Sequence, residues 1–477
     1  MADLDLQQLV DFKNGLICPG AVGESKFPLT AVTESTNFNF NTIGAVTLRN
    51  GTTTLGSGLP GSLLGLYEFR DGGAGTNNRL VAVSGTALYY LSTATWTSKR
   101  SSLTALSPAR FTTFLDYLWM VNGTEDTAIW SGAVGDSFVT TGNASGAPKG
   151  QYIENFRGRV WITGNTSFPD RVYYSSHPTA TATPVVTWDT DVTTGSWIDI
   201  SPNDGDNVTG IKRSKNTLLV FKRNHLYKVF SSDESEPDPK IYVGTYSNES
   251  IVAYKDSVYF HHPTGIYRLN DDGIENISLP VKDYLNNMSA SFYTNVCGWT
   301  DGECIYFSIG DVTANGVTYS KVTLVYNLFS NAWTVYSYPQ DYYFACNYND
   351  GSTIWNLAGG STDVSVMNDG TTDNGTPIIY SLITRPYTFD GLFSTRKRIT
   401  KLDIVHNKME GGVLAYRKDT DDVNKWNDIA RIEKSTSVIH KEIVGNKIWF
   451  RVFGSSVGDP FTFNGLEILK ISSELIG

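Results

Sequence analysis

The chain has 477 residues, 13% of them aromatic and 18% charged, with 44 glycines and a formal net charge of −10. This acidic balance argues against a protein that grips nucleic acid by counterion release, because such binding needs a basic face. The low charged fraction and the ordinary apolar fraction exclude a disordered chain. Abundant aromatic residues and glycines suit pleated sheets and tight turns, so we expect an all-β protein with room for more than one domain.

Residues 1–60 contain few clear hairpins, and we expect an extended N-terminal arm that latches onto the next domain and can supply its closing strand. Asn50-Gly51 is a good turn signal where the arm leads into that domain. The first residues carry neither the basic segment nor the apolar core of a secretory signal. No apolar run approaches the ~18 residues of a membrane span, so we expect no membrane insertion by this chain.

A hairpin pattern repeats through the middle of the chain. In Ser257–Leu269 two apolar arms flank a Pro-Thr-Gly break, where proline presets one turn angle and glycine accepts a positive one. Similar turns recur at intervals of roughly 40 residues, close to the length of a four-stranded propeller blade. We therefore predict an irregular β-propeller of about six blades over residues 61–370. The other turns of the series are Ser84-Gly85, Asn122-Gly123, Gly164, Arg223-Asn224 and Asp301-Gly302.

One interval of this series is stretched by an insertion at about residues 166–206, which is rich in Thr, Pro and Asp. Alternation around Trp188 and at Trp197-Ile198-Asp199-Ile200 suggests short extra strands within it. Insertions of this kind map to one rim of a propeller, where partners are met.

Beyond a linker, residues 378–477 carry longer alternating runs, and a segment of about 100 residues with several such strands has the size of a β-sandwich. Arg396, Lys397, Arg398 and Lys401 form a concentrated basic run that leads into a strand of this domain. Because arginine forks pair directionally with carboxylates, the run is a candidate protein interface. Solubilising charges on an exposed strand are an equally open interpretation. Contact with the DNA backbone ranks third, since so few charges in an acidic protein give little net pull.

No residue pattern indicates a catalytic, cofactor or metal site, and we expect a protein that is not an enzyme. His261 and His262 are adjacent in a strand, so their side chains point to opposite faces and cannot share one metal ion. Asp204-Gly205-Asp206 and Asp271-Asp272-Gly273 look like calcium loops but lack the full ligand set. The four cysteines fit neither a disulfide framework nor a zinc pattern. The sequence also lacks a nucleophile elbow, a phosphate loop and a dinucleotide fingerprint.

Three features spread over most of the chain resemble a known family. The N-terminal segment ends in Ile43–Gly51 (IGAVTLRNG), in which Thr47 and Asn50 replace basic positions of the family's phrase. An irregular aromatic propeller follows, and then a sandwich with characteristic opening and closing phrases. The chain is in this respect similar to the tail hub or nozzle proteins of short-tailed bacteriophages, also known as packaged-DNA stabilisation proteins. The phrases of the sandwich are Thr384–Phe389, Thr395–Arg398, Ile448–Val452 and Phe461–Ile468.

The resemblance implies a structural virion protein, a subunit of a hexameric ring below the portal and its adaptor that encloses the channel for the leaving genome. The implied partners are other copies of the chain, the portal-adaptor protein, other tail proteins such as fibres, spikes or a needle, and genomic double-stranded DNA that passes without sequence-specific binding. Acidic walls are compatible with this role, because they repel phosphates and let DNA slide. The expected location is the phage tail, after assembly in the host bacterial cytoplasm.

Two other functions stay open. One is a carbohydrate-binding or polysaccharide-degrading propeller of a tail fibre or spike, for which rim acids such as Asp189 and Asp191 are the first residues to mutate. The other is an interaction scaffold of the kelch type. Thr323–Tyr336 resembles the strand pair of kelch-like blades, in which a tryptophan plugs the space between neighbouring blades. A genomic neighbourhood of portal, capsid and terminase genes would favour the tail protein over both.

Overall fold

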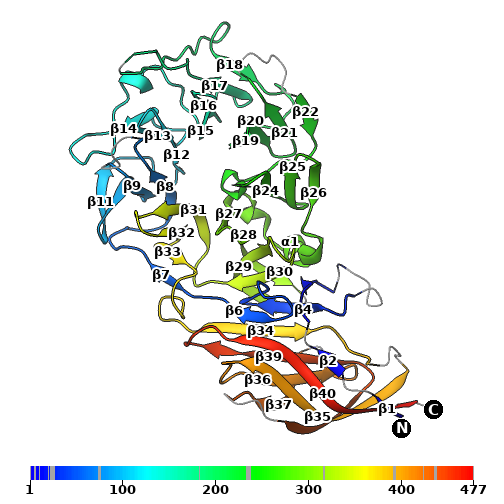
Figure 1. Ribbon diagram of the computed structural model, residues 1–477. Helices are drawn as coiled ribbons and strands as arrows, with labels where there is room; N and C mark the ends of the chain where they lie inside the picture. Colours follow the sequence, from blue (N-terminus) through cyan, green and yellow to red (C-terminus); the bar gives the residue numbers. More distant parts are fainter. Residues whose placement is uncertain are drawn as a thin grey trace.

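The computed structural model describes residues 2–4, 7–9, 11–19, 21, 27–72, 77–181, 183–231, 238–314, 317–389, 394–422, 424–433 and 438–475. It confirms the all-β fold. Strands form eight sheets, and helix is confined in these ranges to α1 (Lys282–Asn286) and short 3-10 segments. Figure 1 shows a ring of small sheets standing on a second β domain, with the two chain ends close together at the far end of that domain. None of the helices in the described ranges is long and apolar enough to cross a membrane.

The ring is a β-propeller of seven blades, each an antiparallel sheet in chain order. Blade one is β8 (Leu63–Phe69), β9 (Arg79–Ser84), β10 (Ala87–Ser92) and β11 (Thr95–Arg100). Blade two is β12 (Arg110–Phe114), β13 (Tyr117–Val121) and β14 (Ala128–Trp130). Blade three is β15 (Tyr152–Phe156), β16 (Arg159–Thr163), β17 (Arg171–Tyr174) and β18 (Trp197–Asp199). Blade four is β19 (Val208–Ser214), β20 (Thr217–Lys222), β21 (Leu226–Val229) and β22 (Asp238–Ile241).

The remaining blades complete the circle. Blade five is β23 (Val252–Tyr254), β24 (Ser257–His262), β25 (Gly265–Asn270) and β26 (Gly273–Asn276). Blade six is β27 (Cys297–Thr300), β28 (Cys304–Ala314), β29 (Val317–Asn327) and β30 (Trp333–Ser337). Blade seven is β31 (Tyr342–Asn349), β32 (Ile354–Gly360), β33 (Val364–Met367) and, from the N-terminal arm, β7 (Thr52–Thr54).

The ring is closed at two levels. The first strand of each blade lies beside the first strand of the next, and β31 of blade seven lies beside β8 of blade one. The outer strand of blade seven is β7, which pairs with β33 so that Thr52 faces Met367 and Thr54 faces Ser365. The start of the chain therefore fastens the end of the propeller.

The propeller has one blade more than the spacing of the turns indicated. Five of the turns used for that spacing join the second and third strands of blades one to five, but Asp301-Gly302 joins the first and second strands of blade six. The next two strands of blade six are eleven residues long. Blade seven therefore lies farther along the chain than the regular interval would place it.

The second domain is a β-sandwich, as expected, and its strands follow the propeller in the chain. They are β34 (Ile378–Thr384), β35 (Thr395–Asn407), β36 (Val413–Lys418), β37 (Asn427–Arg431), β38 (Ile439–Gly445), β39 (Ile448–Ser456) and β40 (Thr462–Leu475). The strands of the N-terminal arm are β1 (Ala2–Leu4), β2 (Gln7–Leu9), β3 (Gly15–Leu16), β4 (Ala31–Thr36), β5 (Phe38–Asn39) and β6 (Val46–Leu48).

Most of the arm lies in the sandwich and not on the propeller, which differs from the expected division at residue 60. One sheet has the order β38-β35-β40-β6-β5, with β1 and β2 paired to β40. The other has ten strands in the order β27-β28-β29-β30-β3-β4-β34-β39-β36-β37. This second sheet begins as blade six and ends in the sandwich, with β3 and β4 of the arm as the link. The arm strand β7 belongs to neither of these two sheets. It pairs with β33 and is therefore part of the propeller.

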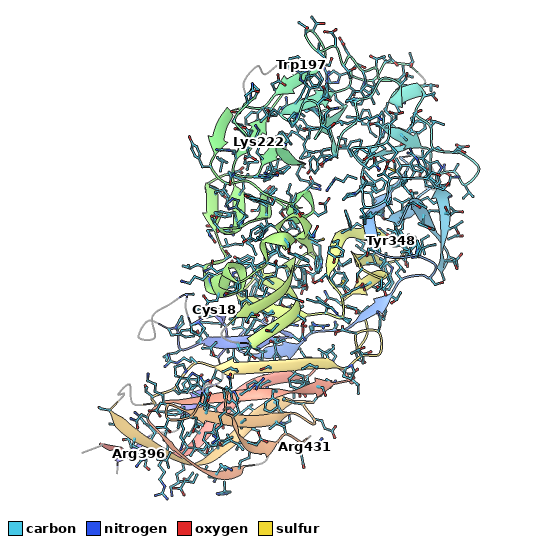
Figure 2. The ribbon with its side chains drawn as sticks, turned by 180° about the vertical axis from the view of Figure 1, so that it is seen from behind. Cys18, Trp197, Lys222, Tyr348, Arg396 and Arg431 are labelled. Atoms are coloured by element: carbon cyan, nitrogen blue, oxygen red, sulfur yellow. The ribbon has the colours of Figure 1, made fainter. Side chains whose placement is uncertain are left out.

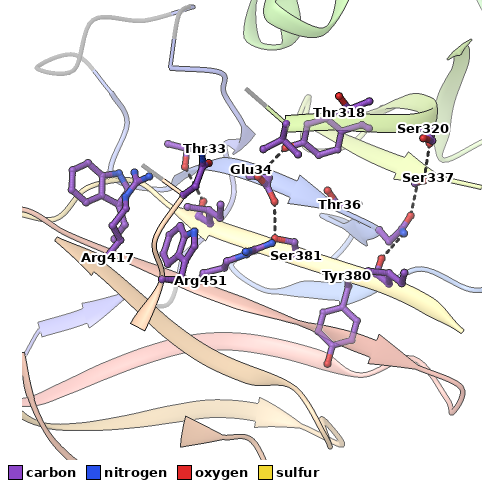
Figure 3. Close-up of a pocket in the computed structure, with 18 of the residues that line it drawn as sticks. Thr33, Glu34, Thr36, Thr318, Ser320, Ser337, Tyr380, Ser381, Arg417 and Arg451 are labelled. Carbon is purple, nitrogen blue, oxygen red and sulfur yellow. Dashed lines mark hydrogen bonds between the residues drawn. The ribbon is translucent and has the colours of Figure 1, made fainter. Parts of the chain in front are cut away.

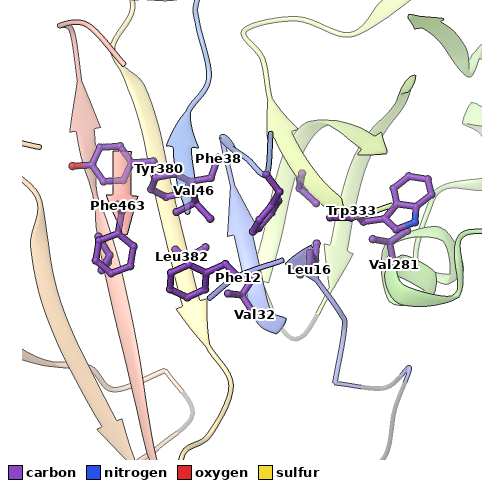
Figure 4. Close-up of a cluster of buried hydrophobic side chains, with 14 of the residues drawn as sticks. Phe12, Leu16, Val32, Phe38, Val46, Val281, Trp333, Tyr380, Leu382 and Phe463 are labelled. Carbon is purple, nitrogen blue, oxygen red and sulfur yellow. The ribbon is translucent and has the colours of Figure 1, made fainter. Parts of the chain in front are cut away.

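The arm is held by apolar burial that reaches from the sandwich into the propeller. Phe12, Val32 and Phe38 from the arm are all at most 2% exposed and belong to the same buried cluster as Leu382 of the sandwich and Trp333 of blade six. Figure 4 shows this cluster as one continuous layer across the junction. Burying large apolar side chains is the main favourable term in folding, so the two domains share a core and do not meet at a wet contact.

Arg49 completes the junction with polar contacts. Its guanidinium binds both carboxylate oxygens of Asp373, at 2.9 and 2.6 Å. It also donates to the side chain of Asn37 and to the carbonyls of Asn50 and Ser337. The side chain is 1% exposed, so a residue of the arm joins the linker and blade six inside the protein.

The rim insertion is anchored on blade four. Lys222 in β20 is fully buried, and its Nζ lies 2.8 Å from Asp170 and 2.7 Å from Asp204, which lie near the two ends of the inserted segment. The insertion contributes β18, whose Trp197 lies at the rim of the propeller far from the sandwich (Figure 2).

Candidate functional site

A groove with a cavity volume of about 940 Å³ lies where the propeller meets the sandwich. One wall is residues 317–320 at the start of β29, which belongs to the long β28–β29 hairpin of blade six. The floor is the outer face of the ten-stranded sheet, formed by β4, β34, β39 and β36. Figure 3 shows polar side chains of the wall and of the floor around the space between them.

Strand alternation builds the floor of the groove. Successive side chains of a strand point to opposite faces of its sheet. In β34, Tyr380 belongs to the sandwich core, and its neighbour Ser381 lines the groove. In β39, Phe450 belongs to that core, while Trp449 and Arg451 on either side of it line the groove. The same alternation that fills the core therefore places arginine and tryptophan on the open face.

Two arginines lie against aromatic rings on this floor. The guanidinium carbon of Arg417 is 4.6 Å from the ring centre of Trp449 and 5.2 Å from that of Trp426. The guanidinium carbon of Arg451 is 4.7 Å from the ring centre of Phe453 and 5.7 Å from that of Trp426. Cation–π contact of this kind orients a guanidinium without using its N–H donors. Burial lowers the pKa of Arg417, an arginine that nevertheless stays charged.

A chain of hydrogen bonds crosses the groove and fixes Arg451. The Tyr319 hydroxyl of blade six donates to Glu34 Oε2 at 2.8 Å. Ser381 Oγ donates to the other oxygen of Glu34 at 2.6 Å, and Arg451 Nε donates to Ser381 Oγ at 3.1 Å. Burial, followed by the Glu34 charge, raises the pKa of Tyr319 far above its ordinary value, so the phenol stays protonated as a donor. The groove walls are thus tied together, and the guanidinium of Arg451 is held in place.

The basic run named from the sequence lies elsewhere and is divided between two faces of β35. Arg396 and Arg398 are exposed, and Arg398 Nε lies 3.0 Å from Glu442 of the neighbouring strand. Lys397 is fully buried on the opposite face, where its Nζ donates to the Thr395 carbonyl. Lys401 is half-buried and follows a bulge in the pairing with β38. Figure 2 places Arg396 at the end of the sandwich far from the propeller.

The acids singled out at the rim act as turn formers. Asp189 and Asp191 are exposed. Asp191 Oδ1 accepts from the backbone amides of Thr194 and Thr193, and these bonds lower the pKa of the carboxyl. In the calcium-like loop Asp204-Gly205-Asp206, the negative charge of Asp204 is balanced by the buried amine of Lys222. In the described ranges, no three His, Cys, Asp or Glu side chains come together as a metal site.

An ion pair lies at the centre of the propeller. The 3-10 segment Asn248–Ser250 (η3) lies beside the innermost strands β19, β27 and β31. Glu249 of this segment receives a two-pronged contact from Arg110 of blade two, at 2.7 and 3.0 Å. Although burial opposes ionisation, the Arg110 charge holds the pKa of Glu249 below its ordinary value. The two side chains therefore stay charged and bridge the ring.

Sequence reasoning did not find the groove residues, because they come from the five strands of its wall and floor, most of them distant in the chain. The signal that could have pointed to them is the Trp-x-Arg alternation at Trp449 and Arg451 within an otherwise apolar strand. A tryptophan and an arginine two positions apart share one face of a strand, and both residue types are enriched at binding surfaces.

The geometry defines an all-β protein in which a seven-bladed propeller and a sandwich share a core and frame a groove. No protein-family model matches the chain, and no curated protein matches it in sequence. Among solved structures, YCF48 from Cyanidioschyzon merolae is similar with a TM-score of 0.41 and 8% identity, over 66% of this chain and 98% of that one. The extracellular domain of BT4673 from B. thetaiotaomicron is similar with a TM-score of 0.45 and 11% identity, over 86% of this chain and 58% of that one. The computationally designed protein Ika8 is similar with a TM-score of 0.38 and 8% identity, over 67% of this chain and 99% of that one. These likenesses concern the fold alone.

Proposed function

We propose that the protein is a structural component of a phage virion, a subunit of a ring-shaped tail hub or nozzle below the portal and adaptor. The observation that supports this most is the position of the family-like phrases. Val46 and Thr47 of the N-terminal phrase pair directly with Phe463 and Thr462 of a C-terminal phrase. Arg49 of the same N-terminal phrase is the buried junction residue. Phrases that are hundreds of residues apart thus build one shared feature, the joint between propeller and sandwich.

The proposed partners are other copies of the chain in a hexameric ring, the portal-adaptor protein, other tail proteins and the passing genomic DNA. The net charge of −10 suits a wall along which DNA slides without being held. Arg110 and Glu249 pair across the centre of the propeller, and this neutral pair offers no open acidic wall there for DNA. The route for DNA in this proposal therefore runs between subunits and not through a single propeller.

The exposed guanidiniums of Arg396 and Arg398 remain the proposed contact with a neighbouring protein of the tail. They project from one face of β35, so an acidic surface can meet both at once. Lys397 takes no part in this contact, because its side chain is buried on the other face.

Electron microscopy of the purified protein, alone and mixed with DNA-filled heads that lack tails, tests the proposal. We expect ring-shaped particles with a central hole, or added density at one vertex of the head. Loss of the gene should give filled heads that leak DNA or fail to eject it. The proposal would be overturned by isolated two-lobed monomers that do not bind the heads, together with stable infectious particles that lack the protein.

A further inference from the structure

We propose that the groove between the β28–β29 hairpin and the sandwich sheet binds an acidic saccharide, a sugar that carries a carboxylate. This inference goes beyond the proposed virion role and does not depend on it. The groove volume of about 940 Å³ lies at the upper end of the range of about 300–1,000 Å³ that is typical of ligand pockets. The space is thus large enough for more than a single small anion.

The anionic group of the ligand is indicated by Arg451. Its Nε is used by Ser381, and its guanidinium plane is supported by Phe453 and Trp426. Within the described part of the chain, neither Nη atom of Arg451 has a hydrogen-bond acceptor. A guanidinium that is oriented by its surroundings and still has a pair of N–H groups to offer matches the geometry of a carboxylate.

The sugar part is indicated by the rest of the lining. Half-buried indole rings at Trp426 and Trp449 offer flat apolar surface for the C–H faces of a pyranose ring. Thr33, Thr318 and Ser320 line the same space. Thr33 Oγ1 already donates to the carbonyls of Ile383 and Thr384, and Thr318 Oγ1 is bonded to Thr313 Oγ1, so these two oxygens can serve a ligand as acceptors. The Glu34 carboxylate accepts one bond at each oxygen, and its remaining lone pairs can accept from sugar hydroxyls. A few placed polar groups among aromatic surface is the usual composition of a specific ligand site.

The topology disfavours an acidic peptide. Extended peptides bind by adding a strand to an exposed sheet edge, where the backbone groups of the sheet are free. Here β34 lies between β4 and β39, and β39 lies between β34 and β36. The floor therefore presents side chains and no unpaired strand edge, and in the described part of the wall the edge open to a peptide is limited to the short stretch 317–320 of β29. Single-stranded nucleic acid is disfavoured as well, because its successive phosphates need a row of cations, and the cations among the lining residues are Arg417 and Arg451.

Calorimetric titration of the full-length protein tests this inference. The probes are hexasaccharides of galacturonic, glucuronic and sialic acid, with maltohexaose as the neutral control, and a hexaglutamate peptide and a thymidine hexanucleotide as the competing classes. We expect binding of at least one acidic hexasaccharide, with an affinity that falls as salt is added. Maltohexaose, hexaglutamate and the hexanucleotide should bind at least tenfold more weakly.

Three variants locate the site. Arg451→Gln and Trp449→Ala should each weaken binding of the acidic sugar at least tenfold, while Arg396→Gln, the same change at the far end of the sandwich, should leave it unchanged. Thermal melting of each variant shows whether it is folded, and Arg451→Lys, which keeps the charge and loses the fork, supplies a milder test with intermediate weakening. The inference is overturned if none of the acidic sugars binds, if Arg451→Gln binds as well as the unchanged protein, or if the peptide or the oligonucleotide binds more tightly than every sugar. None of these outcomes bears on ring formation, so the virion role stands or falls separately.

Discussion

Among single residues, Arg49 is one whose replacement should cost stability at the joint. Its guanidinium is buried, and each of its five N–H groups donates to an acceptor. Replacing it in Arg49→Met leaves the Asp373 carboxylate buried without its cation, at a position where that carboxylate is 6% exposed. Breaking a buried pair in this way costs about 3–5 kcal/mol. We expect the free energy of unfolding in urea to fall by that amount.

Two matched variants check the cause. Arg70→Met removes an arginine from the half-exposed pair with Glu68 and should cost less than about 1 kcal/mol. The double variant Arg49→Met/Asp373→Asn removes both charges and should recover part of the loss. A cost for Arg49→Met as small as that of Arg70→Met would show that the junction does not rely on this contact.

The free energy of unfolding should depend on pH because of the buried side chain of His261. Burial, followed by the neighbouring His262, lowers the pKa of His261 from 6.5 to about 3. Below pH 6.5 the unfolded chain binds a proton that the folded protein does not, so the stability present above that pH is lost as the pH falls toward 3. The loss is about 1.4 kcal/mol per pH unit, or about 2 kcal/mol between pH 6.5 and 5. His261→Phe, which does not titrate, should show a flatter urea stability profile between pH 7 and 5, and equal slopes would contradict the assignment.

At the scale of elements, β7 should control blade seven. A proline in Thr53→Pro cannot donate to the ladder with β33 and should open the outer edge of the blade. We expect faster hydrogen exchange in residues 342–367, measured by mass spectrometry, and a lower melting temperature. Thr54→Ala is the control, because the neighbouring exposed position keeps its N–H group. Unchanged exchange in blade seven with the proline present would mean that the blade does not need its N-terminal strand.

The elements also show how far the sequence could predict the fold. Turn chemistry is local, so Ser84-Gly85 and its counterparts correctly located hairpins in blades one to five. Pairing between distant strands leaves no local signal. The arm does supply a closing strand to the propeller, as expected, but the pairing of Val46 with Phe463 of the sandwich was not predicted. The groove was missed for the same reason, since Glu34, Tyr319 and Arg451 meet only after three separate segments have paired. In Arg396–Arg398 the charge was visible, but the strand that buries Lys397 had to be seen before its face could be assigned.

At the scale of the whole molecule, the proposed contact through Arg396 and Arg398 should govern assembly. Arg396→Ala/Arg398→Ala should lower the fraction of protein in rings or bound to heads, counted in electron micrographs, because both guanidiniums are exposed on one face. Lys408→Ala/Lys425→Ala removes the same charge from other exposed positions of the sandwich and serves as the control. If the two double variants assemble equally well, Arg396 and Arg398 are not an assembly contact and serve as solubilising charges.

The sheet that passes from blade six through β3 and β4 into β34 also gives the joint a mechanical direction. The strands run along the joint, and their hydrogen bonds cross it, as the stacking of β30, β4 and β34 in Figure 1 shows. A sideways force on the propeller acts along the strands and loads the pairs of β30 with β3 and β4, and those of β4 with β34, at the same moment. A force that pulls one edge of the propeller away from the sandwich can open the same pairs one after another. The molecule should therefore resist sideways shear better than such peeling.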